Sequence, residues 1–222
     1  MSWFFNFINS SIGKKILMAM TGVLLCGFLI AHLAGNLLLF AGEEGFNNYV
    51  HGLKNYGMLI RIAEVGLAVL FLSHIANGIR LTLENRQAKG NENELNDAAA
   101  NTTVFSRTMP YTGGIVMIFF FIHLFNFWFR FNVQETGLSY YQIVLSNEYG
   151  FGSPVLSTFY IICMGLLAFH LKHGFQSAFQ TMGLKNEKYA ALIDGISVFF
   201  WLFIPLGFAS LPLYFGFIAG GN

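Results

Sequence analysis

The sequence predicts an all-α integral membrane protein with five transmembrane helices. Of its 222 residues, 55% are hydrophobic and only 10% are charged, whereas roughly 25% are charged in an average soluble domain. Charged residues are almost absent from five long stretches, and each of these exceeds the ~20 residues that a helix needs to cross a bilayer. Basic residues gather on one side of these stretches, as they do in multi-pass membrane proteins.

We expect one domain over residues 1–222. Glu64 is the one acidic residue within the expected spans, and Pro205 and Pro212 are expected to kink the last span. Pro110 stands where the third helix can begin, because proline is tolerated in the first turn of a helix. The five spans are predicted at 16–42, 56–83, 108–130, 154–181 and 195–220.

The segments outside the spans are expected to stay at the membrane surface. Residues 2–13 mix aromatic and polar side chains, and Tyr140 and Tyr141 precede a short apolar run, so both segments suit the headgroup region. Residues 84–107 are rich in polar and charged side chains. We therefore expect a solvated loop there and no further domain.

The distribution of basic residues predicts a cytoplasmic N-terminus. Five spans place the two termini on opposite sides of the membrane, and a cytoplasmic N-terminus puts nine of the twelve basic residues on the inner side. That excess agrees with the positive-inside rule. The inner set is Lys14, Lys15, Arg80, Arg86, Lys89, Arg107, Lys172, Lys185 and Lys188, and the outer set is Lys54, Arg61 and Arg130.

Composition also argues against several functions. A net charge of +1 gives no basic surface for nucleic acid. Cys26 and Cys163 lie in apolar runs, so we expect small buried residues and no disulfide framework. No Cys-x-x-Cys-His motif occurs, which excludes covalent haem attachment at a standard site. The first apolar run is too long for a cleavable signal peptide, so we expect it to be a membrane span.

Four histidines, His32, His74, His123 and His170, lie one each in the first four expected spans. An imidazole in hydrocarbon is costly unless it is bonded, and such residues usually face a bundle interior and mark a site. His32 and His123 lie 17 and 16 residues beyond the last inner basic residue, which places both roughly 24–26 Å from the inner boundary at 1.5 Å per residue. His74 and His170 lie in spans that run inward, and both fall in the inner half.

Three interpretations of these histidines are open: structural hydrogen bonding, transport of a metal ion, and ligation of haem iron. A metal pathway usually adds carboxylates within a turn of its histidines, but Glu64 is ten residues from His74. A flat macrocycle needs room between helices, and Gly35, Gly78 and Gly174 share a helical face with a histidine. Glycine is also common as a packing residue in membrane helices, which is the alternative. Haem fits better, and iron held by two imidazoles favours electron transfer because it has no open position.

Four motifs carry a resemblance to a known family. They are Phe28-Leu-Ile-Ala-His32-Leu, Glu64 ten residues before His74, Ser73-His74-Ile-Ala-Asn-Gly78, and Phe169-His170-Leu-Lys-His-Gly-Phe-Gln-Ser-Ala-Phe179. Together they resemble the dihaem cytochrome b membrane anchor, of the single-chain b558 type, of succinate dehydrogenase or fumarate reductase. The resemblance runs from Lys14 into the fifth span, and its specificity comes from the set of four histidines.

The resemblance implies two b haems, with His74 and His170 as axial ligands of the proximal haem and His32 and His123 as ligands of the distal haem. It implies a flavoprotein and an iron–sulfur subunit on the cytoplasmic face of a bacterial inner membrane. Electrons would pass between these subunits and menaquinone or another quinone in the lipid. This chain would not itself catalyse succinate chemistry, although it could hold the quinone site. The alternatives are a dihaem anchor of a hydrogenase or formate dehydrogenase, and a histidine-based metal transporter.

Polar residues away from the ligands are candidates for quinone binding and proton traffic. Glu64 is one, and His173 is another, although a plain surface role for His173 is an alternative. Some dihaem fumarate reductases carry a glutamate two residues before the fourth ligand, where this chain has Ala168, so a proton route of that type is not expected. The favoured outer-side candidates are Asn47, His51 and Lys54, and the inner-side candidates are Ser10, Ser11 and Lys14.

Overall fold

The computed structural model describes residues 2–88 and 104–219, and these residues form helices and loops without a β-strand. The predicted fold class is confirmed, and the chain is a multi-pass membrane protein. Residues 89–103 of the expected polar loop lie outside the described part of the chain. Five helical segments are long and apolar enough to cross a membrane: Ser11–Lys54, Met58–Gln87, Val104–Asn132, Pro154–Thr181 and Ala190–Ile218.

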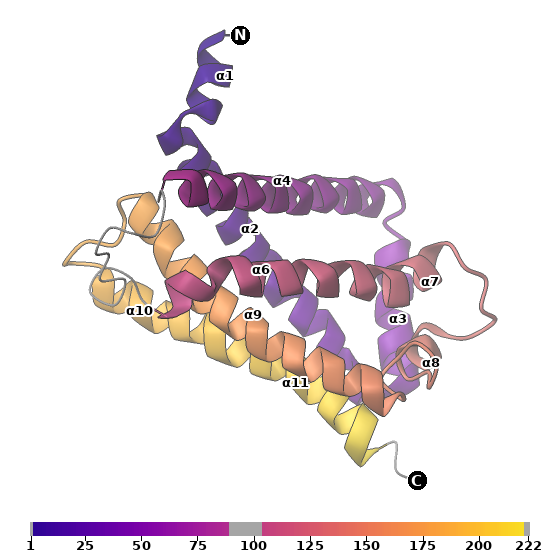
Figure 1. Cartoon of the computed structure of the whole chain (residues 1–222). Helices are drawn as coiled ribbons and strands as arrows, with labels where there is room; N and C mark the ends of the chain where they lie inside the picture. The colour runs from indigo at the N-terminus through magenta and orange to yellow at the C-terminus, as the bar shows by residue number, and fades with distance from the viewer. Residues whose placement is uncertain (1, 89–103, 220–222) are drawn as a thin grey trace.

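The chain begins with a short helix, α1 (Ser2–Asn9), that projects from the side of the bundle and does not continue the first span (Figure 1). The break falls at Ser10, whose hydroxyl donates to the Phe7 carbonyl at 2.6 Å and accepts from the Gly13 N–H at 3.0 Å. Because this serine caps the next helix, α2 (Ser11–Leu37) begins five residues before the predicted start at residue 16.

A helix that the sequence analysis missed lies across the end of the bundle that is opposite Lys14, which the predicted orientation places on the outer side and which is called the outer end. The 3₁₀ turn η1 (Leu38–Ala41) closes α2, Gly42 turns the chain with a φ of 83°, and α3 (Gly42–Lys54) follows. Figure 1 shows α3 bridging the end of α2 and the start of the second span. Glu43 and Glu44 lie in its first turn, where the helix dipole favours negative charge.

The second and third spans extend into the expected polar loop from both ends. Helix α4 (Met58–Ala88) continues past residue 83, and α6 (Val104–His123) begins before residue 108, so Pro110 lies inside a helix and not at its start. A π turn, η2 (Leu124–Trp128), follows His123 directly, and α7 (Phe129–Asn132) completes the third span. Helical ends that leave the hydrocarbon carry polar residues, so composition alone did not separate them from a loop.

The fourth and fifth spans lie side by side. After the short helix α8 (Tyr140–Val144), α9 (Pro154–Thr181) matches the predicted bounds, because the Ser153 side chain caps its first turn. The fifth span consists of α10, the π turn η3, α11 and the π turn η4. The π turn η3 ends two residues before Pro205, and the π turn η4 begins two residues after Pro212. Both turns lie near a proline because proline cannot donate a helical hydrogen bond. Their bounds are Ala190–Val198, Phe199–Phe203, Ile204–Leu213 and Tyr214–Ile218.

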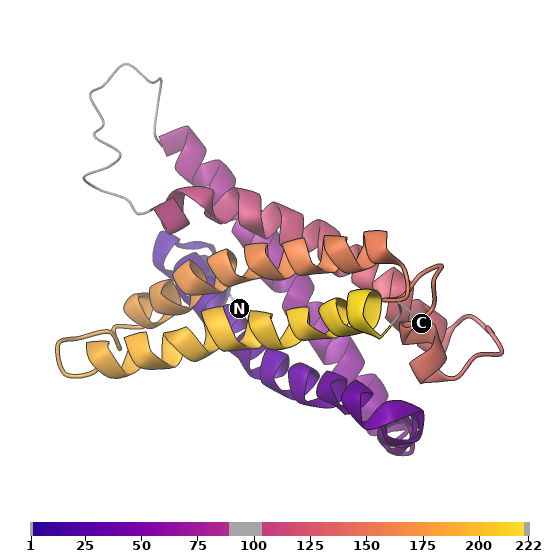
Figure 2. The same cartoon turned by 90° about the horizontal axis from the view of Figure 1, so that it is seen from below.

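Helices α2, α4, α6 and α9 form a four-helix bundle, and the fifth span packs on the outside against α9 and α2 (Figure 2). Helix α6 packs closely on α9, and α4 packs on α2. By contrast, α4 and α6 approach each other sparsely. Helix α2 also packs closely on α9. The bundle is therefore closely packed from α4 through α2 and α9 to α6, with one looser seam between α4 and α6.

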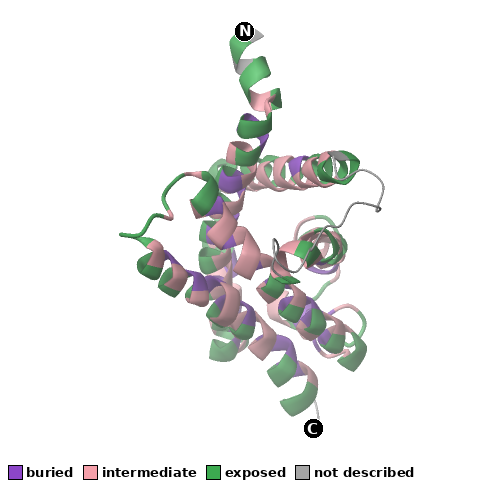
Figure 3. Cartoon of the chain, turned by 60° about the vertical axis from the view of Figure 1, so that its left-hand side comes forward, coloured by how far each residue is buried: buried purple, intermediate pink, exposed green. Residues whose placement is uncertain are grey.

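Buried residues are limited to the faces where helices cross, and much of the surface is half-buried or exposed (Figure 3). Large apolar side chains such as Leu59 and Val65 are exposed, as lipid-facing residues must be. Cys26 and Cys163 are buried and free, which confirms that they form no disulfide. One buried cluster closes the outer end of the bundle and is called the outer cap: Leu39, Phe46, Val50, Phe127, Ile143, Val144, Phe151, Tyr160, Leu211 and Phe215.

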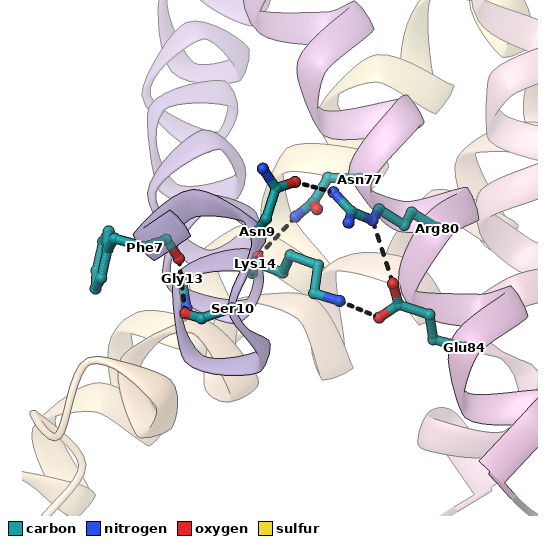
Figure 4. Close-up of polar contacts among 8 residues, drawn as sticks. All are labelled: Phe7, Asn9, Ser10, Gly13, Lys14, Asn77, Arg80 and Glu84. Atoms are coloured by element: carbon teal, nitrogen blue, oxygen red, sulfur yellow. Dashed lines mark hydrogen bonds and ion pairs between the residues drawn. The ribbon is translucent and has the colours of Figure 1, made fainter. Parts of the chain in front are cut away.

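A polar network ties α1, α2 and α4 together at the other end (Figure 4). Lys14 is only 6% exposed and forms an ion pair with Glu84, which also accepts from Arg80 Nε at 3.2 Å. Arg80 Nη1 donates to Asn9 Oδ1 at 2.8 Å, and Asn77 Nδ2 donates to the Lys14 carbonyl at 2.7 Å. A buried ammonium needs such partners, so this network fixes the elbow between α1 and α2 against α4.

Gly35 offers a test of the packing between α2 and α3. A Cβ atom at Gly35 would overlap the Tyr49 ring, whereas a Cβ at the exposed Gly27 of the same helix meets nothing within 4 Å. We expect Gly35→Val to lower the free energy of unfolding by about 1–3 kcal/mol through overpacking. Thermal unfolding of the purified protein in detergent measures this. Gly27→Val is the matched control, and equal melting temperatures for the two variants would contradict the packing described.

Candidate functional site

The four intramembrane histidines line one cavity of about 1960 Å³ between α2, α3, α4, α6 and α9. A site for one small molecule usually measures about 300–1,000 Å³. The interior of the bundle is therefore large enough for more than one bulky ligand, and its lining is mostly apolar.

Within this cavity the histidines meet in two pairs, each joining two different helices. The ring centres of His32 on α2 and His123 on α6 are 5.7 Å apart, with an interplanar angle of 89°. The ring centres of His74 on α4 and His170 on α9 are 6.4 Å apart, at 74°. Two imidazoles on opposite sides of one metal ion place their ring centres roughly 6 Å apart, because each metal–nitrogen bond is about 2 Å long and each ring adds its own radius. Both pairs therefore fit a single iron between them.

A layer of aromatic rings lies between the two histidine pairs. Phe71 of α4 stacks on Phe120 of α6 with ring centres 4.3 Å apart, and Phe28 of α2 meets Phe71 edge-on at 6.1 Å. Each of these phenylalanines precedes a histidine by about one helical turn. Since α4 runs antiparallel to α2 and α6, the layer falls between the pairs and also bridges the seam between α4 and α6.

The second ring nitrogens of the four histidines have different surroundings. His74 Nδ1 lies 3.0 Å from the hydroxyl of Thr21, and His32 Nδ1 lies 3.4 Å from the side-chain amide of Asn36. His123 Nδ1 and His170 Nδ1 are buried and have no hydrogen-bond partner. Second-shell partners of this kind orient a ligating histidine and fix its tautomer, so the four candidates differ in how firmly they are held.

An internal repeat that the sequence analysis missed explains the pairing. The pattern Met-x-x-Thr-Gly, with a histidine ten residues after the glycine, occurs in α2 and again in α6. In α4 and in α9, a histidine is followed by a glycine four residues later. The first copy is Met18, Thr21, Gly22, His32, His74 and Gly78, and the second is Met109, Thr112, Gly113, His123, His170 and Gly174.

The contacts made by the two copies are equivalent. A Cβ at Gly22 would lie 3.4 Å from His74 Cε1, and a Cβ at Gly113 would lie 3.3 Å from His170 Cε1. Likewise, a Cβ at Gly78 would lie 3.4 Å from Met18 Cε, and a Cβ at Gly174 would lie 3.3 Å from Met109 Cε. Helices α2 and α4 therefore form one half of the bundle, and α6 and α9 form an equivalent half. Each histidine pair consists of one histidine from the first half and the equivalent histidine from the second half.

The three glycines that share a helical face with a histidine do more than leave room for a macrocycle, because each one packs against a side chain of another helix. Gly78 and Gly174 receive a methionine methyl group from the neighbouring helix, and Gly35 receives the Tyr49 ring. All three also line the cavity. Spacing from a histidine on the same helix could not indicate which side chain of another helix would fill the space.

The two ends of the cavity differ in chemistry. Basic side chains line the inner end: Lys15, Arg86, Arg107 and His173. At the outer end, Glu64 accepts from Arg61 Nη1 at 2.7 Å and from Trp128 Nε1 at 3.2 Å. Trp128 belongs to the π turn after His123, so the widened turn carries this ring toward Glu64.

The other polar candidates are engaged in fastening the outer loop. Asn47 Oδ1 accepts from the Tyr141 N–H at 3.0 Å, and Lys54 Nζ donates to a carbonyl of α7 at 2.6 Å. Lys54 and His51 both contact the Tyr140 ring, at 4.6 Å and 5.1 Å. Burial raises the pKa of the Tyr141 phenol, and the nearby Glu43 carboxylate adds to this shift.

On the inner side, Ser10 caps α2 and Lys14 is ion-paired, while Ser11 begins α2. Quinone binding by any of them stays a prediction.

Comparison with known proteins agrees with this arrangement. Residues 15–101 match the family described as succinate dehydrogenase/fumarate reductase transmembrane subunit. This match confirms the resemblance to the membrane subunit of succinate dehydrogenase or fumarate reductase, whereas the dihaem b558 type stays a prediction. The chain is also similar to the succinate dehydrogenase hydrophobic membrane anchor subunit of Halobacterium salinarum, with 36% identity over 61 residues, which is 28% of this chain and 46% of that protein. The match thus spans about half the length of that relative. No solved structure matches the chain.

The family match includes His32 and His74 but ends before the second copy of the repeat. His123 and His170 lie outside the matched residues and occupy the positions in the second copy that are equivalent to His32 and His74. Across the described residues, no three histidine, cysteine or acidic side chains converge as a metal-ion site. Two separate imidazole pairs are what the bundle offers.

Gly113 provides a test of the site. Valine at this position would add methyl groups beyond a Cβ that already lies 3.3 Å from the His170 ring. We expect Gly113→Val to displace this ring and lower the haem content of the purified protein by about one haem per chain, because an axial ligand must keep its position. A haem assay normalised to protein measures the loss. Gly165→Val, at an open position of the same helix as His170, is the control, and full haem content in Gly113→Val would refute the contact's importance.

Proposed function

We propose that this chain is the membrane anchor and electron-transfer subunit of a succinate:quinone oxidoreductase, a succinate dehydrogenase or fumarate reductase. The observation that carries the proposal is the presence of two imidazole pairs in one apolar cavity, with ring centres 5.7 Å and 6.4 Å apart. The family match over residues 15–101 supports the same conclusion.

Two b haems are the cofactors that this site fits. His74 and His170 would hold the inner, proximal haem, and His32 and His123 the outer, distal haem. The basic residues at the inner end of the cavity, Lys15 among them, suit the carboxylate side chains that a b haem carries. When bound, the haems would supply one-electron transfer between the two sides of the bundle.

The remaining residues of the chain prepare the site for that task. The outer cap excludes water from the His32–His123 pair, and the aromatic layer of Phe28, Phe71 and Phe120 keeps the two pairs apart. With both positions of each metal filled by imidazole, small substrates have no access to the iron. Electron transfer is therefore favoured over oxygen binding or substrate chemistry.

The partners follow from the proposed function. We infer a flavoprotein and an iron–sulfur subunit that dock at the inner, basic end, on the cytoplasmic side that the positive-inside rule predicts. This end presents the Lys14–Glu84–Arg80 network and the basic cavity mouth. The succinate and fumarate chemistry would belong to those subunits, and this chain would connect them to the lipid phase.

The quinone, menaquinone or a related compound, is proposed to react near Glu64. This carboxylate lines the cavity within the second span and is held by Arg61 and Trp128. Quinone chemistry consumes or releases protons, and a positioned carboxylate can carry them. The fastened outer residues Asn47 and Lys54 are the less suitable candidates, because their polar groups already have partners.

The alternatives are distinguished by simple observations. A metal transporter is disfavoured because the described residues contain no site with three convergent ligands, and zinc usually takes three or four protein ligands. A dihaem anchor of a hydrogenase or formate dehydrogenase would share the haem sites but not the partners. Reduction of the haems by succinate in the purified complex supports the proposed function, and a colourless protein would rule out every haem-based alternative.

The pairing of the ligands is tested by single substitutions. We expect His74→Ala and His170→Ala to remove the same haem, and His32→Ala and His123→Ala to remove the other, because each pair would share one iron. Low-temperature absorption spectra and electron paramagnetic resonance of the ferric protein identify which haem is lost. His51→Ala, outside the cavity, is expected to retain both. Loss of different haems from His74→Ala and His170→Ala would show that the pairing is wrong.

A conservative change at Glu64 tests the quinone proposal. Glu64→Gln keeps the size of the side chain but removes its charge, so we expect both haems to remain while electron transfer to a soluble quinone analogue slows by about 100-fold or more. Stopped-flow haem oxidation measures this step. Glu148→Gln, at an exposed loop residue, is the control. An unchanged rate in Glu64→Gln would move the quinone site elsewhere.

A further inference from the structure

We propose that Thr21 and Thr112 are equivalent positioning residues that hold the two inner histidines, His74 and His170, in the tautomer that binds iron. This inference rests on the proposed function, since it concerns how the inner haem is held. It comes from the internal repeat and from hydrogen-bond geometry, and it concerns residues that are not haem ligands themselves.

The hydrogen bond of Thr21 has a defined direction. Its hydroxyl lies 2.8 Å from the Leu17 carbonyl and 3.1 Å from the Met18 carbonyl, so its one hydrogen is donated within α2. With that hydrogen on the helix carbonyls, the 3.0 Å contact with His74 Nδ1 uses an oxygen lone pair. The imidazole therefore donates from Nδ1, and a neutral imidazole that carries its proton there leaves Nε2 free to bind a metal.

The surroundings of Thr21 make this arrangement rigid. The residue is 5% exposed, and its bond to the preceding turn of α2 fixes the direction of the hydroxyl. Its neighbour Gly22 lets the His74 ring approach, since even a Cβ there would lie 3.4 Å from Cε1. Threonine and glycine thus act together: the glycine admits the ring and the threonine sets its rotation.

Thr112 repeats the burial and the intrahelical hydrogen bonds of Thr21 in the second half of the bundle, but the structure has no bond between its hydroxyl and His170 Nδ1. It is also 5% exposed, and its hydroxyl donates to the Thr108 and Met109 carbonyls, both at 3.2 Å. Its neighbour Gly113 would place a Cβ 3.6 Å from His170 Nδ1. His170 Nδ1 is buried without a partner, and an unsatisfied polar atom in an apolar bundle is costly. The lone pair of Thr112 is the acceptor that the repeat provides, and we assign this bond to the haem-loaded protein.

In the described part of the chain, no threonine hydroxyl contacts the Nδ1 atoms of the outer pair, His32 and His123. His32 Nδ1 has only a 3.4 Å contact with Asn36, which lies one turn further along the same helix. His123 Nδ1 has no partner in the structure. Accepting a hydrogen bond from the second nitrogen makes a ligating imidazole a stronger donor to the metal. The threonines should therefore favour the ferric state of the inner haem and leave the outer haem unaffected.

The experiment uses the complete complex, in which this chain is bound to its partner subunits. Each threonine of this chain is substituted in turn. Thr21→Val, Thr112→Val and the double variant keep the side-chain shape but remove the acceptor. We expect the affinity for the inner haem to fall about 10–100-fold, as for other second-shell partners of a ligating histidine. We also expect the midpoint potential of that haem alone to rise, and its electron paramagnetic resonance signal to shift. Redox titration and haem retention on dilution measure these effects.

Matched variants separate positioning from packing. Thr21→Ser and Thr112→Ser keep an acceptor and should restore the parental potential, whereas Thr21→Ala and Thr112→Ala should behave as the valine variants do. Thr158→Val removes a helical hydroxyl that also bonds the carbonyl four residues back, at 2.8 Å, but that is exposed and does not line the cavity. It should change neither haem.

The outcomes distinguish this inference from the proposed function. A parental complex without two haems overturns the proposed function. A parental complex with two haems, whose double valine variant keeps both potentials and both resonance signals, overturns only the inference. Equal shifts of both haems, or serine variants as impaired as the alanine variants, would show a general packing effect and would also overturn it.

Discussion

Burying four imidazole rings inside apolar helices is the constraint on which the rest of this structure depends. A ring nitrogen has no water to bond with in the hydrocarbon, so each histidine must face the interior, and the interior must leave space for what satisfies it. The bundle meets this need by packing α2 on α4 and α6 on α9 while leaving the seam between α4 and α6 loose. Packing is then supplied away from the cavity, by the outer cap, by the inner network and by a fifth span without a histidine.

The internal repeat turns that constraint into a symmetric site. Each half contributes one helix with a threonine–glycine step and an outer histidine, and one antiparallel helix with an inner histidine. Because equivalent histidines pair, anything held between them lies near an approximate twofold axis along the spans, as in parallel repeats of other membrane proteins. The symmetry is broken at the inner end. Asn77 bonds the Lys14 carbonyl, whereas His173, at the equivalent position after His170, lines the cavity.

The sequence predicted the features that residues within one helix determine, such as the position of a span and the start of a helix. Charge-free stretches located all five spans, and α9 matched to the residue because Ser153 and Pro154 mark its start locally. Helix α3 was missed because Glu43 and Glu44 directly follow the first predicted span, 16–42, where only a connection to the next span was expected. These two residues instead lie in the first turn of a further helix. The π turns could not be predicted, because they depend on how a whole span packs. The depth of each histidine indicated its partner, but Nδ1 contacts such as that of His74 with Thr21 depend on the rotation of two helices.

The two histidine pairs would give two haems different electron affinities. The inner pair combines the Thr21 hydroxyl, which would strengthen the His74 ligand and favour ferric iron, with a basic cavity mouth, whose positive charge would favour ferrous iron. The outer pair lies among aromatic rings: Phe28 and Phe208 contact His32, and Phe119 and Phe127 contact His123. An apolar shell disfavours the extra charge of ferric iron and so raises the potential. The outer site has no opposing hydrogen-bond acceptor of the Thr21 kind. The two sites therefore differ in the groups that would set the potential of a bound haem: a hydroxyl acceptor and basic side chains at the inner site, and an aromatic shell at the outer site.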